Sequence, residues 1–104
     1  MEILRFRFDG GRATTATAPC IVGVVASGNL EVMIEPTPGD DVCAIDVSTA
    51  ANGFGAVWQA VLGDFFDRHR IGGIRVSIND NGATPAIVAL RLDQAIEQFA
   101  HEGA

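Results

Sequence analysis

Alternation of hydrophobic and polar residues predicts the strands of this chain. In residues 2–8, for example, Leu4, Phe6 and Phe8 share one face, and the other face carries two arginines. A period of two is that of a strand with one buried face. The predicted strands are residues 2–8, 20–26, 30–35, 42–47 and 74–78.

The pair Gly28-Asn29 separates the second and third of these strands. Glycine accepts the positive φ that a two-residue hairpin turn requires at its first central position. We therefore expect a hairpin closed by Gly28-Asn29, with Ser27 beside its exposed tip.

A continuous apolar stripe predicts a helix between residues 54 and 66. Its members recur with a period of 3.6 residues, as on a helix face that packs against a core. They are Phe54, Val57, Trp58, Val61, Leu62, Phe65 and Phe66. Asn52-Gly53 is a helix-start signal before the stripe, and Gly72-Gly73 is expected to end the segment.

A second helix is predicted to begin at Thr84-Pro85, because threonine suits the N-cap and proline suits the first helical position. Its apolar face carries Val88, Leu92, Ala95, Ile96 and Phe99. Residues 86–92 also alternate, so a strand there, followed by a shorter helix capped by Asp93, is an open alternative.

The predicted elements follow the order β-β-β-β-α-β-α, and each helix has one apolar stripe to bury. We therefore expect an α+β fold, a two-layer sandwich of a mainly antiparallel sheet with two helices on one face. The length of 104 residues fits a single domain spanning residues 1–104.

Charge and hydropathy exclude some classes of partner and favour others. The net charge of -6 and the lack of a basic run argue against nucleic acid. Arg5 and Arg7 lie where a signal peptide would need an apolar core, and residues 20–26 are too few to span a bilayer. We therefore expect a cytoplasmic protein without a membrane partner. A mean hydropathy of +0.26 is high for a small domain and predicts an apolar surface against larger subunits.

Residues that could carry chemistry are few. His69 and His101 stand at polar helix ends, where solvated side chains are expected. Cys20 and Cys43 lie in apolar stretches and are interpreted as small buried side chains, without metal-ligand spacing. No carboxylate pair or complete dinucleotide fingerprint is present. On pattern alone Ser27 is a turn residue.

Three stretches resemble one family, the acyl carrier (delta) subunits of malonate decarboxylase. They are VVASGNLEVMIEP, STAANGFGAVWQAVL and VSINDNGATPAIVALRLDQAIE, and the likeness covers the chain from about Cys20 to Glu97. Ala26 and Asn29 stand where the family more often has glycine and aspartate. Neither difference removes the hydroxyl of Ser27.

The resemblance implies an acyl carrier without a catalytic site of its own. Ser27 would carry a covalent phosphodiester-linked arm, 2'-(5''-phosphoribosyl)-3'-dephospho-CoA, whose thiol bears acetyl and malonyl groups. The implied partners are the acyl transferase and decarboxylase subunits and the transferase that installs the arm. The alternatives are a citrate lyase-type (gamma) acyl carrier, a structural subunit without an arm, and a small hydrolase that would need Ser27 near His69 or His101.

Overall fold

The computed structural model describes residues 1–13, 20–37 except 23–29, and 39–102. The elements are β1 (Glu2–Phe8), β2 (Arg12–Ala13), β3 (Cys20–Val22), β4 (Leu30–Pro36), β5 (Cys43–Thr49), α1 (Gly55–His69), β6 (Ile71–Gly72), β7 (Ile74–Asp80) and α2 (Pro85–Glu102). The short strands β2 and β6, which the sequence pattern does not predict, form a separate parallel pair.

The main sheet has the strand order β1-β5-β7-β4-β3. Three neighbouring pairs are antiparallel and only β5 and β7 run parallel, so the expected mainly antiparallel sheet is confirmed. The parallel pair results from the α1 crossover, because parallel neighbours need a long connection. Among the described strands, β3 forms one edge of the sheet and β1 forms the other.

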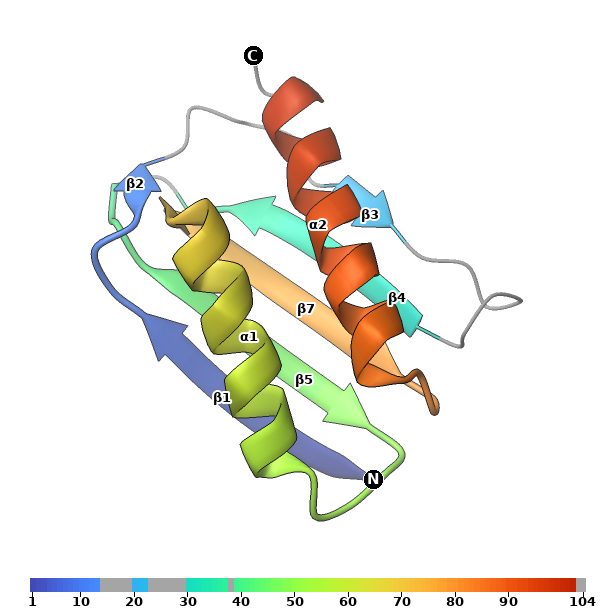
Figure 1. The fold of residues 1–104 in the computed structure, drawn as a ribbon. Coiled ribbons are helices and arrows are strands. Elements are labelled where there is room, and N and C mark those ends of the chain that lie inside the picture. The colour runs from blue at the N-terminus through green and yellow to red at the C-terminus, as the bar shows by residue number, and fades with distance from the viewer. Residues whose placement is uncertain (14–19, 23–29, 38, 103–104) are drawn as a thin grey trace.

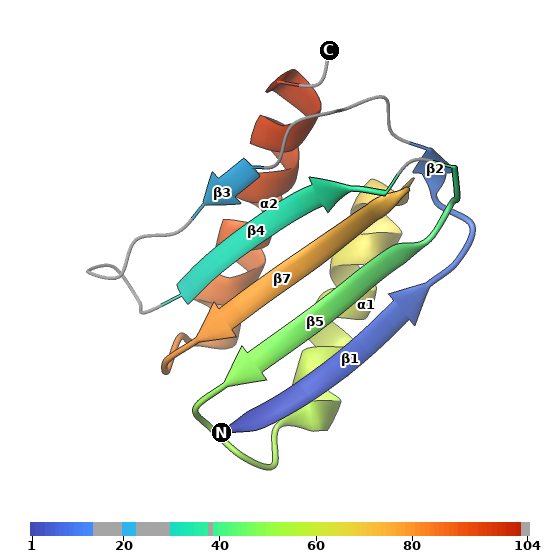
Figure 2. The ribbon, with the colours of Figure 1, turned by 180° about the vertical axis from the view of Figure 1, so that it is seen from behind.

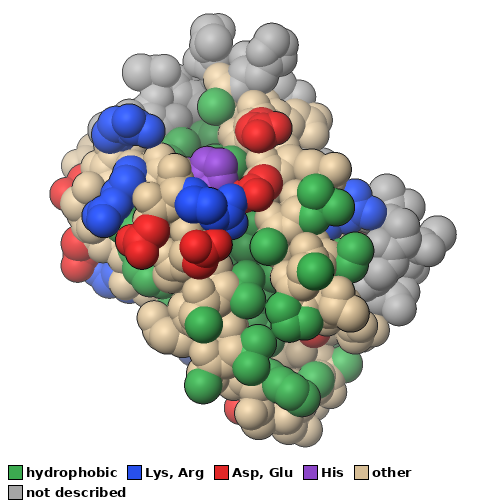
Figure 3. Space-filling view, viewed as in Figure 1, with side chains coloured by type: hydrophobic (Ala, Val, Ile, Leu, Met, Phe, Trp, Pro, Cys, Tyr) green, Lys and Arg blue, Asp and Glu red, His purple; other side chains and the backbone are tan. Residues whose placement is uncertain are grey.

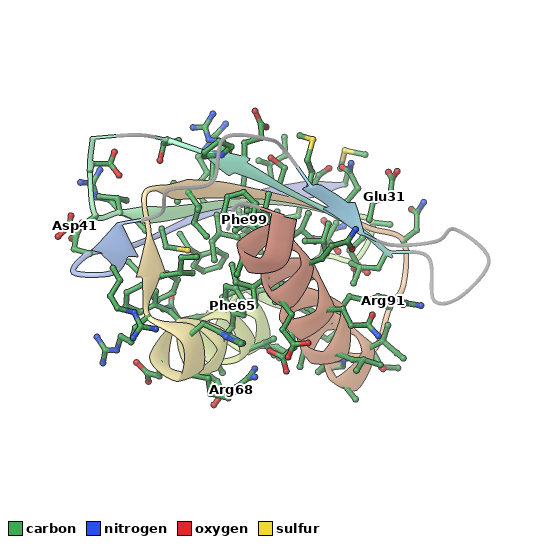
Figure 4. The ribbon with its side chains drawn as sticks, turned by 90° about the horizontal axis from the view of Figure 1, so that it is seen from above. Glu31, Asp41, Phe65, Arg68, Arg91 and Phe99 are labelled. Atoms are coloured by element: carbon green, nitrogen blue, oxygen red, sulfur yellow. The ribbon has the colours of Figure 1, made fainter. Side chains whose placement is uncertain are left out.

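Both helices cover the same face of the sheet, as Figures 1 and 2 show from opposite sides. The helix α1 packs against β1 and α2, and α2 packs against β3 and β4. Figure 4 shows the two layers edge-on, with Phe65 and Phe99 between the helices and the sheet. Both rings are fully buried. The α+β two-layer architecture expected from the sequence is therefore confirmed.

The other face of the sheet is polar, and no described element covers it (Figure 2). Asp46 lies between Arg5 and Arg75, with an N···O distance of 3.7 Å to each guanidinium. Glu31 and Glu35 lie on the same face, on β4. This surface is typical of a solvated sheet face.

The helix α1 begins later than the sequence signal predicts. Its N-cap is Phe54, which makes no side-chain capping hydrogen bond, so Asn52-Gly53 is wrong as the helix start. The helix ends at His69, before Gly72-Gly73. Arg70 follows in the left-handed conformation, and its N–H donates to the Phe66 carbonyl at 2.7 Å. This bond satisfies one of the carbonyls at the helix end.

The helix α2 begins at Pro85, as predicted. Thr84 Oγ1 accepts a hydrogen bond from the Ile87 N–H at 3.3 Å, which is the geometry of an N-cap. The helix runs through residues 86–92, so the alternative strand there is wrong. Every residue of its predicted apolar face is buried: Val88, Leu92, Ala95, Ile96 and Phe99.

Candidate functional site

The segment that contains Ser27 connects two paired strands. In the antiparallel pair of β3 and β4, Val22 lies opposite Val32. A two-residue turn at Gly28-Asn29 would instead place Val22 opposite Glu35, so the predicted two-residue hairpin is wrong in its register. Residues 23–29, Ser27 and the predicted turn included, lie outside the described part of the chain. Along the sequence Ser27 is the midpoint between Val22 and Val32.

The described strand that follows this segment is firmly held. Leu30, the first residue of β4, is fully buried and lies opposite Asp80 at the end of β7. Val32 and Ile34 continue the buried face of β4 beneath α2. A serine three residues before Leu30 is therefore attached to a rigid part of the core.

A buried polar pair lies beside Leu30 and shapes this end of the sheet. Thr49 Oγ1 donates to Asp80 Oδ2 at 2.8 Å. Asp80 Oδ1 accepts from the N–H groups of Gly82 at 3.2 Å and Ala83 at 2.8 Å. These bonds tie the ends of β5 and β7 to the turn that starts α2.

A cavity of about 320 Å³ lies above this pair, between the N-terminal halves of α1 and α2. We call it the helix groove. It is lined by Thr49, Ala51, Phe54, Val57, Trp58, Val61, Asp80, Gly82, Ala83, Pro85 and Val88. Apart from Thr49 and Asp80, the lining side chains are apolar, and none of them is cationic.

Apolar side chains gather on the surface around the helix groove, in the lower half of Figure 3, whereas charged side chains gather at the opposite end of the helices. Phe54 is 49% exposed and Val57 is 41% exposed. Their predicted place in the core is therefore wrong. Trp58 is buried as predicted, and it forms part of the groove wall.

The charged end carries a side-chain cluster that joins the two helices. Asp93 Oδ1 on α2 lies 2.8 Å from His69 Nε2 and 2.5 Å from Arg68 Nη1 on α1. Burial acts to raise the pKa of Asp93, but the hydrogen bonds from His69 and Arg68 outweigh it and lower this pKa. His69 is half-buried against Phe65, so the expectation of a solvated histidine is wrong.

The sequence model for "Malonate decarboxylase delta subunit" matches residues 17–99. The chain belongs to this delta-subunit family. It is 57% identical over 100 residues to the malonate decarboxylase acyl carrier protein of Burkholderia cepacia, covering 96% of this chain and 92% of the relative. A protein of the same name from Xanthomonas axonopodis pv. citri is 58% identical over 98 residues, with 93% of each chain covered.

A solved structure supports the same assignment. A chain of a Pseudomonas malonate decarboxylase hetero-tetramer, crystallised in complex with malonate, superimposes with a TM-score of 0.82 and 38% sequence identity. The match covers 95% of this chain and 99% of that one. The delta-subunit resemblance inferred from the three sequence stretches is thus confirmed, and the two relatives and the solved structure described above are all named for malonate decarboxylase.

The other candidate residues of this delta-subunit chain form no reactive arrangement in the described structure. Cys43 is buried, as predicted, and burial raises the pKa of its thiol to about 12. Leu30 lies opposite Asp80, the last residue of β7, whereas His69 ends α1 and comes before the start of β7. The His69 ring is held by Asp93. The side chains of Cys20 and His101 lie outside the described part.

Neither a cluster of metal-ligating side chains nor a membrane-spanning helix is found among the described residues. They contain no group of three or more histidine, cysteine, aspartate or glutamate side chains placed to hold a metal ion. Neither described helix is long and apolar enough to cross a membrane. The chemically informative features of this delta-subunit chain are therefore the position of Ser27 in the sequence and the helix groove.

Proposed function

We propose that this chain is the acyl carrier subunit of a malonate decarboxylase, with Ser27 as the attachment residue of its arm. The arm is 2'-(5''-phosphoribosyl)-3'-dephospho-CoA, joined to the Ser27 hydroxyl by a phosphodiester. The observation that carries the proposal is the family match over residues 17–99, which includes the ASGNLEV stretch around Ser27. The chain itself would carry the arm between catalytic sites and would catalyse no step of the reaction.

The described flanks support Ser27 as an anchor. Ser27 is the fifth residue after Val22 and the fifth before Val32, which lie opposite each other in the β3–β4 pair. Leu30 then fixes the segment to the sheet beside Asp80. A group that must visit several catalytic sites needs an accessible anchor on a rigid scaffold, and a segment between two paired strands provides it.

Attachment requires a second protein. A serine hydroxyl needs a general base to become a nucleophile, and the residues next to Ser27 in the sequence, Ala26 and Gly28, offer none. A separate transferase would therefore remove the Ser27 proton. The Oγ atom would then attack the first phosphorus of a triphosphoribosyl precursor, forming the phosphodiester and releasing pyrophosphate.

The bound arm supplies a thioester, whose carbonyl supports acyl exchange and stabilises the carbanion formed when carbon dioxide leaves. The subunits that perform these two steps are an acyl transferase and a decarboxylase, and the hetero-tetramer of the Pseudomonas relative supports such partners. Tethering raises the acyl group's effective concentration at each partner site to roughly the millimolar range. A cytoplasmic, non-catalytic role in this complex is part of the proposal.

Mass spectrometry of the loaded chain tests the proposal. Wild type incubated with the transferase and the triphosphoribosyl precursor should gain the mass of one phosphoribosyl-dephospho-CoA, and proteolysis should place it on the peptide that contains Ser27. Ser27→Ala should gain nothing. Ser77→Ala, on β7, is the matched control and should be labelled like wild type. Labelling of Ser27→Ala, or an unlabelled wild type that still supports malonate decarboxylation, would overturn the assignment.

A further inference from the structure

The helix groove lies within reach of an arm on Ser27, whatever path residues 23–29 take. Ser27 is three residues from Leu30, so their Cα atoms are at most about 11 Å apart. Leu30 lies opposite Asp80 in an antiparallel pair, which adds about 5 Å. Asp80 lines the groove. A pantetheine chain of about a dozen bonds extends about 15 Å by itself, and the nucleotide part of the arm adds more.

The chemistry of the groove suits only one end of such an arm. Its walls are apolar, and its volume of about 320 Å³ lies at the lower end of the range for ligand cavities, about 300 to 1,000 Å³. No cationic side chain lines it to bind phosphates, and the one charged group is the Asp80 carboxylate. The phosphates of the arm would therefore stay outside, and the thioester end is the part that fits.

The acyl group on the thioester decides whether it enters. Acetyl is small and uncharged, so its burial among Phe54, Val57 and Trp58 costs little. Malonyl ends in a carboxylate, which would lose its hydration and approach Asp80 with no cation to compensate. The two forms of the arm differ by this one negative charge.

We propose that the helix groove binds the acetyl thioester end of the arm on Ser27 and excludes the malonyl thioester end. This inference rests on the proposed function, because it requires the arm. Replacement of acetyl by malonyl would then release the arm from the groove and expose it to the decarboxylase. After loss of carbon dioxide, the acetyl form would return to the groove.

Thioester cleavage by hydroxylamine tests the proposal without a partner subunit. The amine attacks the thioester carbonyl, the acyl group leaves as a hydroxamic acid, and the arm keeps its thiol. Intact mass follows the loss of the acyl group. An acetyl group that occupies the groove for four-fifths of the time should be cleaved about fivefold more slowly than acetyl-CoA. The malonyl form should be cleaved within about twofold of the malonyl-CoA rate.

Two variants that fill the groove give the test its controls. Val57→Phe and Ala83→Phe should bring the acetyl cleavage rate up to that of acetyl-CoA. Leu90→Phe is the matched control, because Leu90 is an aliphatic helix residue, 50% exposed, that does not line the groove. Its rate should equal the wild-type rate. Thermal unfolding of each variant verifies that it is folded.

The emission of Trp58 provides a second measurement. It is the sole tryptophan, and it lines the groove. Its emission should differ between the acetyl and malonyl forms of wild type and of Leu90→Phe, and should be equal in the two forms of the groove-filling variants.

The outcomes separate this inference from the proposed function. If wild type gains no arm, both fail. If the arm is present but acetyl is cleaved at the acetyl-CoA rate, or both filling variants keep the slow rate, the inference alone is overturned. If in addition the filling variants weaken assembly with the larger subunits, the groove is a protein interface.

Discussion

Thr49 and Asp80 form a buried side-chain pair, 2.8 Å between Oγ1 and Oδ2, that joins the ends of the two parallel strands. Thr49 is 1% exposed and Asp80 is 7% exposed. The same carboxylate accepts two N–H groups of the turn before α2. The pair therefore holds the floor of the helix groove and the start of α2 together.

Thr49→Val removes the hydroxyl at nearly constant volume and leaves Asp80 Oδ2 buried without that donor. The free energy of unfolding should fall by about 1 to 3 kcal/mol, the usual cost of an unsatisfied buried polar group. Urea denaturation measures it. Ser48→Ala, on the adjacent residue and the opposite face of β5, should change stability by less than about 0.5 kcal/mol. Equal effects of the two variants would contradict this account.

The Asp93 cluster predicts a pH dependence. The pKa of Asp93 is lowered in the folded chain, so its ionised form stabilises the fold at pH values above the ordinary 3.8, and that stabilisation is lost as the pH falls through the lowered value. Because Asp93 is partly exposed, Asp93→Asn should cost at most about 1 kcal/mol near pH 7. The difference from wild type should shrink toward zero in acid below the lowered pKa.

Urea midpoints measured across this pH range test the prediction. Asp67→Asn is the control, because the Asp67–Arg70 pair is exposed and should contribute little at any pH. A difference between Asp93→Asn and wild type that stays constant from neutral to acid pH would show that the carboxylate charge is not the cause.

Cys43 should be inert toward thiol reagents in the folded chain. With a pKa of about 12, raised by burial, only about one thiol in ten thousand is ionised at pH 8. In a Cys20→Ala background, a disulfide reagent should react with Cys43 only after denaturant is added. Fast labelling of the native chain would contradict the burial of Cys43. An inert Cys43 also could not exchange with a thioester on the arm.

Sequence patterns predict those features that depend on neighbours along the chain. The alternation in β1 and the N-cap at Thr84 were predicted correctly, because period and capping are local properties. The exposure of Phe54 and Val57 was not, because an apolar stripe has the same period whether it faces a core or borders a groove. His69 was missed for a related reason, since its partner Asp93 is 24 residues away in the sequence.

The same distinction between local and long-range features applies to the candidate site. Ser27 could be singled out only by family resemblance, since a serine near a turn carries no chemical signal of its own. The helix groove could not be predicted, because it combines β5, α1, β7 and α2. Strand β4 also pairs with β7, a long-range contact that a hairpin rule for residues 20–35 does not include.

Gly72 gives the last prediction, because its role differs from the helix stop that the sequence suggested. A Cβ on Gly72 would overlap the backbone carbonyl of Asp41, so glycine is needed there for close approach. Gly72→Ala should lower the free energy of unfolding by about 1 to 3 kcal/mol, as overpacking usually does. Gly63→Ala is the matched control: Gly63 lies within α1 with open space around its Cβ position, so alanine should stabilise the chain by up to about 1 kcal/mol. Denaturant titrations of the two variants should therefore shift in opposite directions. Stabilisation by Gly72→Ala would show that β6 and the Asp41 backbone do not lie in contact.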